Sequence, residues 1–258
     1  MRQSWDRRIR RAEQLASQRS PAESLLTFYT RLLRRQKDLY DSLTTRVSGS
    51  FDRDLPLIRR LASSVLRDVS EHGPEQLALD ARRLLESGDS AIEDVLAAYW
   101  RAPTDRQFFA KAILQPYAAC LVDGGVTHDR LLTRADNCCP RCGGTPQLAL
   151  LEPAGALTAE GGSRQLLCAN CLTPWPFRRV LCPHCGEGDE RKVGYFQSPT
   201  FEHVRVDACE SCRHYLKSVD LGRLGLAVPI VDEVAAAALD LWAREHGYEK
   251  IELNLVGL

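Results

Sequence analysis

The sequence predicts an α+β protein with an all-α N-terminal domain, two tandem metal-binding modules and a C-terminal helix. Three observations support this. Apolar residues recur at helical spacing through residues 1–125, cysteine pairs dominate residues 139–212, and helical spacing returns at 231–246. The expected parts are 1–134, 135–180, 181–224 and 225–258.

The N-terminal part contains successive amphipathic segments, which argue for a helical bundle with short loops. The last segment stops at Gly124-Gly125, a C-terminal helix signal. We expect the arginine-rich face near the N-terminus to be solvated helix surface, with a docking patch as the alternative. The apolar runs begin at Leu25, Leu57, Leu77, Ile92 and Phe108, and the arginines are Arg7, Arg8, Arg10 and Arg11.

Composition excludes several classes of protein. No stretch approaches the roughly 18 consecutive apolar residues of a membrane span, so we expect no membrane insertion. Residues 1–15 are charged and lack the apolar core of a secretory signal, which makes the cytoplasm the expected location. Residues 139–223 carry 10 basic and 9 acidic side chains. Nucleic-acid binders need a basic footprint, so this near-neutral region argues against nucleic acid as a partner.

Cysteine is the informative residue type. The chain has 10 cysteines, and eight of them form C-x-x-C pairs, a spacing typical of metal knuckles. An exported chain would favour a disulfide framework, but nothing in this sequence points to export. Cys120 is expected to be a buried helix cysteine, whereas Cys138 abuts the first pair and is an alternative ligand. The pairs are Cys139/Cys142, Cys168/Cys171, Cys182/Cys185 and Cys209/Cys212.

The pairs belong to an internal repeat of about 42 residues. The first and third pairs, CPRCGG and CPHCG, have proline after the first cysteine and glycine after the second, and the other two pairs lack both features. We expect Gly143 and Gly186 to adopt the left-handed conformation that points backbone N–H groups at sulfur. The repeat predicts one site from Cys139, Cys142, Cys168 and Cys171, and a second from Cys182, Cys185, Cys209 and Cys212.

Two knuckles that meet from separate hairpins form a tetrahedral four-sulfur shell, which suits zinc or a single iron. Such a shell leaves no open coordination position, so each site is expected to be structural or redox-active rather than hydrolytic. The alternative is a set of disulfides or free thiols. His184 and His214 lie beside knuckles and are alternative ligands, although exposed loop histidines are the simpler interpretation.

The segments around the knuckles are short. Residues 178–181, 193–196 and 204–206 predict strands. A helix is expected at 231–246, ended by Gly247. The apolar tail at residues 251–258 is expected to cover another element or a partner.

The cysteine region resembles the FdhE family of formate dehydrogenase accessory proteins. The resemblance covers residues 135–258 and rests on CPRCGGTP, LLCANCLTPWPFRRVLCPHCG, VRVDACESCRHYLKSVDL and DEVAAAALDLWAREHGYEKIELNL. It implies a cytoplasmic helper that binds the catalytic subunit of respiratory formate dehydrogenase before export. It also implies rubredoxin-like iron binding by the eight paired cysteines, with zinc as the alternative metal.

The leading hypothesis is therefore a maturation factor and not an enzyme, with two metal ions in four-cysteine sites. We find no phosphate loop, nucleophile elbow or paired carboxylates, so no catalytic residues and no further cofactor site are assigned. A homodimer is a possible assembly. The competing hypotheses are a zinc-ribbon adaptor that binds nucleic acid and a rubredoxin-like electron-transfer protein.

Overall fold

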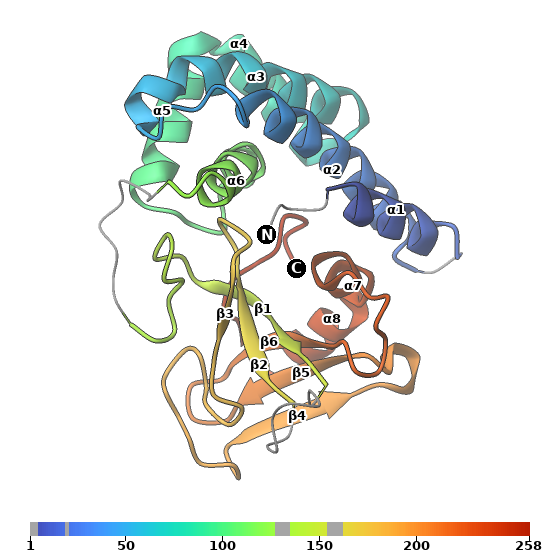
Figure 1. Ribbon diagram of the computed structural model, residues 1–258. Helices are drawn as coiled ribbons and strands as arrows, with labels where there is room; N and C mark the ends of the chain where they lie inside the picture. The colour runs from blue at the N-terminus through green and yellow to red at the C-terminus, as the bar shows by residue number, and fades with distance from the viewer. Residues whose placement is uncertain (1–4, 19–20, 127–134, 154–161) are drawn as a thin grey trace.

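The computed structural model describes residues 5–18, 21–126, 135–153 and 162–258. A layer of N-terminal helices lies over a mixed sheet, and two C-terminal helices fill the space between the first helix and the sheet (Figure 1). The predicted α+β fold class is confirmed. No helix within the described ranges is long and apolar enough to span a membrane.

The N-terminal layer has a central helix, α6. Every residue from Ala110 to Leu121 is buried, including Lys111 and Gln115, and the helix continues through Pro116. Each predicted apolar run lies in one helix of this layer. The helices are α1 (Trp5–Ala16), α2 (Glu23–Leu43), α3 (Phe51–His72), α4 (Glu75–Glu86), α5 (Gly88–Arg101) and α6 (Phe108–Asp123).

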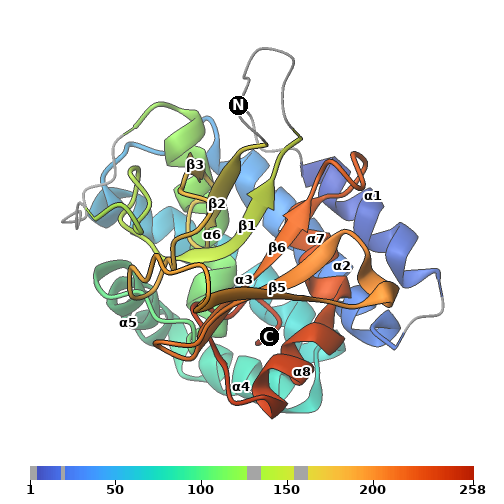
Figure 2. The same ribbon diagram turned by 90° about the horizontal axis from the view of Figure 1, so that it is seen from below.

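The sheet is built from two copies of one three-stranded meander. Its strand order is β3-β2-β1-β6-β5-β4, with β7 paired to β6. Within each meander the strands are antiparallel, and the two meanders are joined by the parallel pair β1/β6 (Figure 2). The strands are β1 (Pro146–Leu151), β2 (Arg164–Cys168), β3 (Pro174–Pro176), β4 (Val193–Gln197), β5 (Val204–Cys209), β6 (His214–Asp220) and β7 (Glu249–Lys250), and the 3-10 turn η1 (Pro199–Phe201) follows β4.

The two predicted metal modules therefore share one continuous sheet. The predicted strands at 193–196 and 204–206 are confirmed as parts of β4 and β5. The prediction of a strand at 178–181 is wrong. The buried Arg164 side chain donates hydrogen bonds to the carbonyls of Arg178, Arg179 and Leu181. These backbone carbonyls therefore bond to a side chain and not to a neighbouring strand. The boundaries of the four predicted parts stay a prediction.

The single helix predicted at 231–246 is two helices, α7 (Pro229–Ala235) and α8 (Ala237–Glu245). The break has a visible cause. Lys217 on β6 extends its ammonium group to the carbonyls of Glu233 and Ala236, and a side chain that competes for helix carbonyls interrupts the helical ladder. Gly247 follows with a φ of 76°, as expected for a helix stop.

The arginine-rich face of α1 is only partly solvated: Arg7 and Arg10 are exposed, as predicted, whereas Arg8 is buried and Arg11 is half-buried. Arg8 is 8% exposed, Arg11 forms an ion pair with the buried Asp232 on α7, and Arg7 donates to the carbonyl of Ala227. These contacts bind α1 to the C-terminal part. The buried part of this face therefore docks on its own chain.

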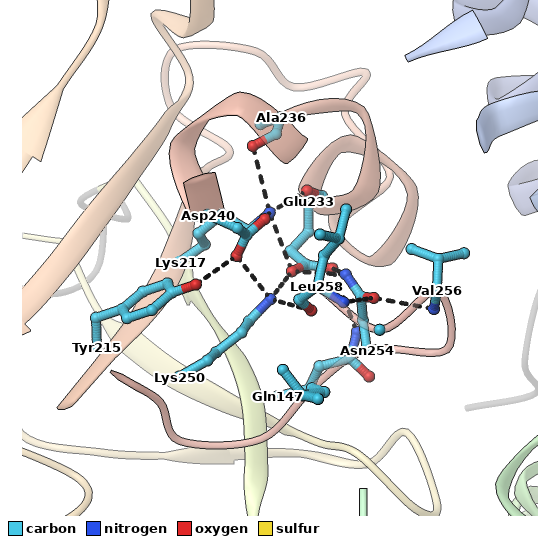
Figure 3. Close-up of polar contacts among 12 residues, drawn as sticks. Gln147, Tyr215, Lys217, Glu233, Ala236, Asp240, Lys250, Asn254, Val256 and Leu258 are labelled. Carbon is cyan, nitrogen blue, oxygen red and sulfur yellow. Dashed lines mark hydrogen bonds and ion pairs between the residues drawn. The ribbon is translucent and has the colours of Figure 1, made fainter. Parts of the chain in front are cut away.

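A cluster of buried charges fixes the C-terminal helices and tail to the sheet (Figure 3). Lys217, Glu233, Asp240 and Lys250 have side chains at most 1% exposed and form ion pairs with one another. Asn254 donates to both carboxylate oxygens of Glu233 at 3.1 and 2.8 Å. Two cations therefore face two anions, which meets the requirement that buried charges be paired.

The C-terminal tail covers the junction between the two layers. Leu255 is 3% exposed in the core. Lys111 of α6 binds the Glu252 carboxylate at 2.6 Å and also donates to the carbonyl of Leu253. The apolar tail thus packs on elements of its own chain.

Candidate metal centres

All four C-x-x-C knuckles contain the same turn. The residue after the second cysteine adopts a positive φ in each knuckle, and its N–H donates to the carbonyl of the first cysteine. The φ angles are 68° at Gly143, 58° at Leu172, 76° at Gly186 and 60° at Arg213, and the corresponding N–O distances are 2.8, 3.2, 3.0 and 2.9 Å.

The expected left-handed conformation of Gly143 and Gly186 is confirmed. No sequence pattern indicated this conformation at Leu172 and Arg213, because it costs a non-glycine residue about 1–2 kcal/mol and is rarely expected there. Their presence at equivalent positions shows that the knuckle, rather than local preference, sets the backbone there.

The first centre brings together the four cysteines that the repeat assigned to it. The sulfur atoms of Cys139 and Cys171 lie 3.6 Å apart, and the Cys142 sulfur lies 3.4 Å from those of both Cys168 and Cys171. A disulfide requires about 2.0 Å, so these thiols are not bridged. Metal–sulfur bonds of about 2.3 Å in a tetrahedron place the sulfurs about 3.8 Å apart. The cluster is therefore suited to one four-coordinate metal ion.

The helical layer braces the first centre. Tyr99 on α5 donates to the side-chain carbonyl of Asn170 at 2.7 Å, and Gln115 on α6 donates to the carbonyl of Ala169 at 2.7 Å. Both acceptors belong to the knuckle between Cys168 and Cys171. The N–H of Asn170 points at the Cys168 sulfur from 3.3 Å. Sequence reasoning missed these supports because they come from distant helices.

Gly144 is required by close packing rather than by its backbone angles. A Cβ atom there would lie 2.7 Å from the Asn170 side-chain nitrogen and 3.0 Å from the Cys168 sulfur. The glycine doublet of the first knuckle thus has two separate roles, a left-handed turn at Gly143 and close approach to sulfur at Gly144. The third knuckle needs only the turn, and Glu187 follows its single glycine.

Burial of the first centre opposes free thiolates there. Its four cysteines are 0–3% exposed. Burial raises the pKa of the Cys168 thiol well above its usual value, because a thiolate loses hydration there. Several bare thiolates so close together would repel one another in a dry environment. A bound divalent or trivalent cation would offset this repulsion. Four thiolates are a donor set that suits zinc or iron.

The second centre has the same layout but a different environment. Its sulfur atoms lie 3.7 Å apart for Cys182 and Cys212 and 3.7 Å apart for Cys185 and Cys209. Cys182 and Cys209 are buried, Cys212 is half-buried and Cys185 is exposed. The first centre is therefore buried in the core, whereas one ligand of the second, Cys185, reaches the surface.

Two histidines lie against the exposed side of the second centre. The rings of His184 and His214 stack with centroids 3.6 Å apart and planes 9° from parallel, and their nitrogens lie close to the Cys212 sulfur. The lone pair of an imidazole lies in its ring plane. Two parallel rings therefore cannot both direct a lone pair at one ion, and in this arrangement they cover the knuckle.

The two unpaired cysteines are separate from the clusters. Cys120 is buried on α6, as expected, and burial raises its pKa to about 12. Cys138 lies beside Asn137 and belongs to neither group of four. Burial also raises the pKa of Cys138, which opposes formation of a free thiolate ligand.

Comparison with known proteins gives a consistent result. Residues 180–256 match the model of the FdhE C-terminal domain. An FdhE homolog from Aquifex aeolicus is 30% identical over 197 residues, which cover 75% of this chain and 68% of that protein. An FdhE homolog from Pseudomonas aeruginosa is 31% identical over 133 residues, which cover 48% of this chain and 40% of that protein.

A solved structure shares the fold. The crystal structure of the FdhE protein from Pseudomonas aeruginosa superposes with a TM-score of 0.71 and 23% sequence identity. The match covers 99% of this chain and 97% of that one. The arrangement of helical layer, double meander and C-terminal helices is therefore shared with that protein.

Proposed function

Because the chain belongs to the FdhE family, we propose that it binds the catalytic subunit of formate dehydrogenase in the cytoplasm and assists its maturation before export. Proteins of this family are accessory proteins in formate dehydrogenase formation and are generally not catalytic. The observation that carries the proposal is the family relationship to the Aquifex aeolicus homolog, which spans both the helical layer and the cysteine region.

The eight paired cysteines are the proposed metal ligands, with Cys139, Cys142, Cys168 and Cys171 in the first centre and Cys182, Cys185, Cys209 and Cys212 in the second. We propose iron in these sites, with zinc as the alternative. A bound ion would supply positive charge that holds four thiolates together. It would tie each pair of hairpins into one rigid unit, which suits a binding scaffold.

The different environments of the centres support distinct roles. The first lies between the helical layer and β1/β2, so its metal would stabilise the junction of the two layers. The second exposes Cys185 and has no brace from the helical layer among the described residues. We propose that the surface around the second centre contacts the catalytic subunit.

The direct test is binding of the purified chain to the isolated catalytic subunit under anaerobic conditions, measured by native mass spectrometry. A 1:1 or 2:2 complex with two metal ions per chain is the expected result. Elemental analysis of the same sample identifies the metal, and iron in a four-sulfur site gives visible absorption that zinc lacks. Absence of a complex with the metal-loaded chain would contradict the proposed function.

One observation favours a second function. The exposed Cys185 would place an iron ion near the surface, where an electron-transfer partner has access. A reversible redox transition that reduces or oxidises formate dehydrogenase would support that role. A colourless zinc-loaded chain that binds the catalytic subunit equally well would exclude it.

A further inference from the structure

Among the described residues the sheet ends at β3 and at β4, and its repeat leaves a position unfilled beside β4. Cys168 at the end of β2 pairs with Pro146 of β1, and Cys209 at the end of β5 pairs with Val193 of β4. This register makes β4 the counterpart of β1. The outer side of β1 is filled by β6, which pairs with it in parallel. The same side of β4 has no strand beside it in the part of the chain that the structure describes.

The free side of β4 presents backbone groups for pairing. The N–H of Glu210 donates to the carbonyl of Lys192 at 2.8 Å, which fixes the hydrogen-bonded side of this strand pair. Because these bonds alternate along antiparallel strands, Tyr195 and Gln197 direct their N–H and C=O groups outward. Tyr195 is 62% exposed and Gln197 is exposed as well, so this end of the edge is open to solvent. An open edge of this kind is a template for another strand.

A cleft rich in arginine lies beside this edge. It has a volume of about 290 Å³ and is bounded by Arg164, Arg179 and Arg205, with Tyr195 at its rim. This volume is at the lower limit of the roughly 300–1,000 Å³ typical of small-molecule sites, which favours one inserted side chain over a whole cofactor.

The repeat indicates that the inserted side chain carries a carboxylate. Arg164 begins β2 in the first meander, and Arg205 occupies the same register in the second. Arg164 forms an ion pair at 3.3 Å with Asp207, a carboxylate supplied by the neighbouring meander. Arg205 has no neighbouring meander beyond β4 and instead pairs with Asp207 of its own strand at 2.8 Å.

The charge of the cleft also favours a carboxylate as the inserted group. Arg179 is exposed and has no ion-pair partner among the residues described, and the buried Arg164 has an Nε–H group without a hydrogen-bond acceptor in that set. Three guanidinium groups face only two carboxylates, those of Asp207 and Glu190. An added carboxylate would accept hydrogen bonds in the planar geometry that guanidinium favours.

We propose that β4 accepts an extended acidic segment of the catalytic subunit as a parallel strand, with one carboxylate of that segment in the arginine cleft. This inference rests on the proposed function, because it names the surface by which the catalytic subunit is bound. The added strand would pair with β4 as β6 pairs with β1. Its carboxylate would give Arg205 and the unpaired Arg179 an acceptor from outside their own meander, as Asp207 of β5 does for Arg164.

Two variants test the two halves of the proposal in the full metal-loaded chain. Tyr195→Pro removes an outward N–H and spares the β4–β5 hydrogen bonds, a position where proline is tolerated. Arg179→Glu reverses an unpaired charge of the cleft. The matched control is Arg60→Glu, which reverses an exposed arginine of α3 that has no ion-pair partner among the described residues and lies outside the cleft. The dissociation constant for the isolated catalytic subunit is measured for each variant, with metal content as the check on folding.

We expect each test variant to weaken binding about tenfold or more and the control to have little effect. Amide hydrogen exchange at Tyr195 and Gln197 in the wild-type chain is expected to slow in the complex, a readout independent of any variant. Equal binding by all variants, with unchanged exchange at β4, would overturn the inference while leaving the proposed function intact. Failure of the wild-type chain to bind the subunit would instead contradict the proposed function.

The alternative occupant is a second copy of this chain. Sedimentation of the wild-type chain alone is expected to show no association through β4. A dimer that Tyr195→Pro converts to monomer would assign the edge to self-association and overturn the proposal.

Discussion

The two metal centres are expected to release their ions in a fixed order when the protein meets a chelator. The second centre has an exposed ligand, Cys185, and a chelator reaches it without unfolding of the chain. The first centre has all four ligands in the core, so release requires local opening. We therefore expect a fast phase of one metal equivalent from the second centre and a slow phase of one equivalent from the first.

The structure gives the size of the difference. Opening the first centre exposes neighbouring buried side chains such as Leu166, Leu172 and Trp175, which are 0–5% exposed. Burial of one such side chain contributes about 1.5–3 kcal/mol, so exposing two of them costs about 3–6 kcal/mol. At about 1.4 kcal/mol per factor of ten, the slow phase should be slower by about two to four orders of magnitude.

The assay uses zinc-loaded chain, excess chelator and a chromophoric zinc indicator. Substitution of both Cys209 and Cys212 by serine should abolish the fast phase only. Substitution of both Cys139 and Cys142 by serine should abolish the slow phase and unfold the first meander. Cys138→Ser is the control and should leave both phases unchanged. Release of both equivalents in one phase, or loss of the fast phase in the first-centre variant, would refute the reasoning.

Three further predictions follow from single contacts. Gly186→Ala should weaken metal binding at the second centre about 5- to 30-fold in a chelator competition, because a left-handed alanine costs about 1–2 kcal/mol, whereas Gly188→Ala, which lacks a positive φ, should have no effect. Asp240→Asn should lower the free energy of unfolding in urea by about 3–5 kcal/mol, because it leaves a buried lysine without its counter-charge; an unchanged midpoint would contradict this. Burial alone would raise the pKa of Asp232, but the hydrogen bond from His203 helps to hold this pKa below its usual value. The stability that this carboxylate contributes is therefore complete above its unfolded pKa of about 4 and is lost as the pH falls through the lower folded pKa, and Asp232→Asn should flatten that acid limb in denaturant titrations.

The grouping of the cysteines was predictable because it depends on chain connectivity. Two knuckles with proline and glycine at matching places, 43 residues apart, mark a duplicated unit, and each unit contains one complete set of four ligands. Cys139 and Cys182 open their units, so the ligand sets follow from order alone. The helical runs were equally clear, because apolar spacing records which face of a helix is covered.

Features that depend on distant partners were not predictable. The run at 178–181 has the composition of a strand, but Arg164 takes its carbonyls. The run at 231–246 has the spacing of one helix, but Lys217 divides it. Arg11 of α1 has the spacing of a solvated residue, but it forms an ion pair with the buried Asp232. In each case a long charged side chain, buried along its length, decides the local structure.

The contrast between the centres arises from what lies next to each copy of the repeat, since the copies themselves are alike. The first meander has neighbours on two sides. The helical layer covers its knuckle through Tyr99 and Gln115, and β6 of the second meander fills the edge of β1. The second meander ends the row on its β4 side, so among the described residues the edge that corresponds to β1 has no strand beside it, and its ligand Cys185 is exposed. A chain that binds at this end of the repeat would therefore lie on the meander whose metal centre has the exposed ligand.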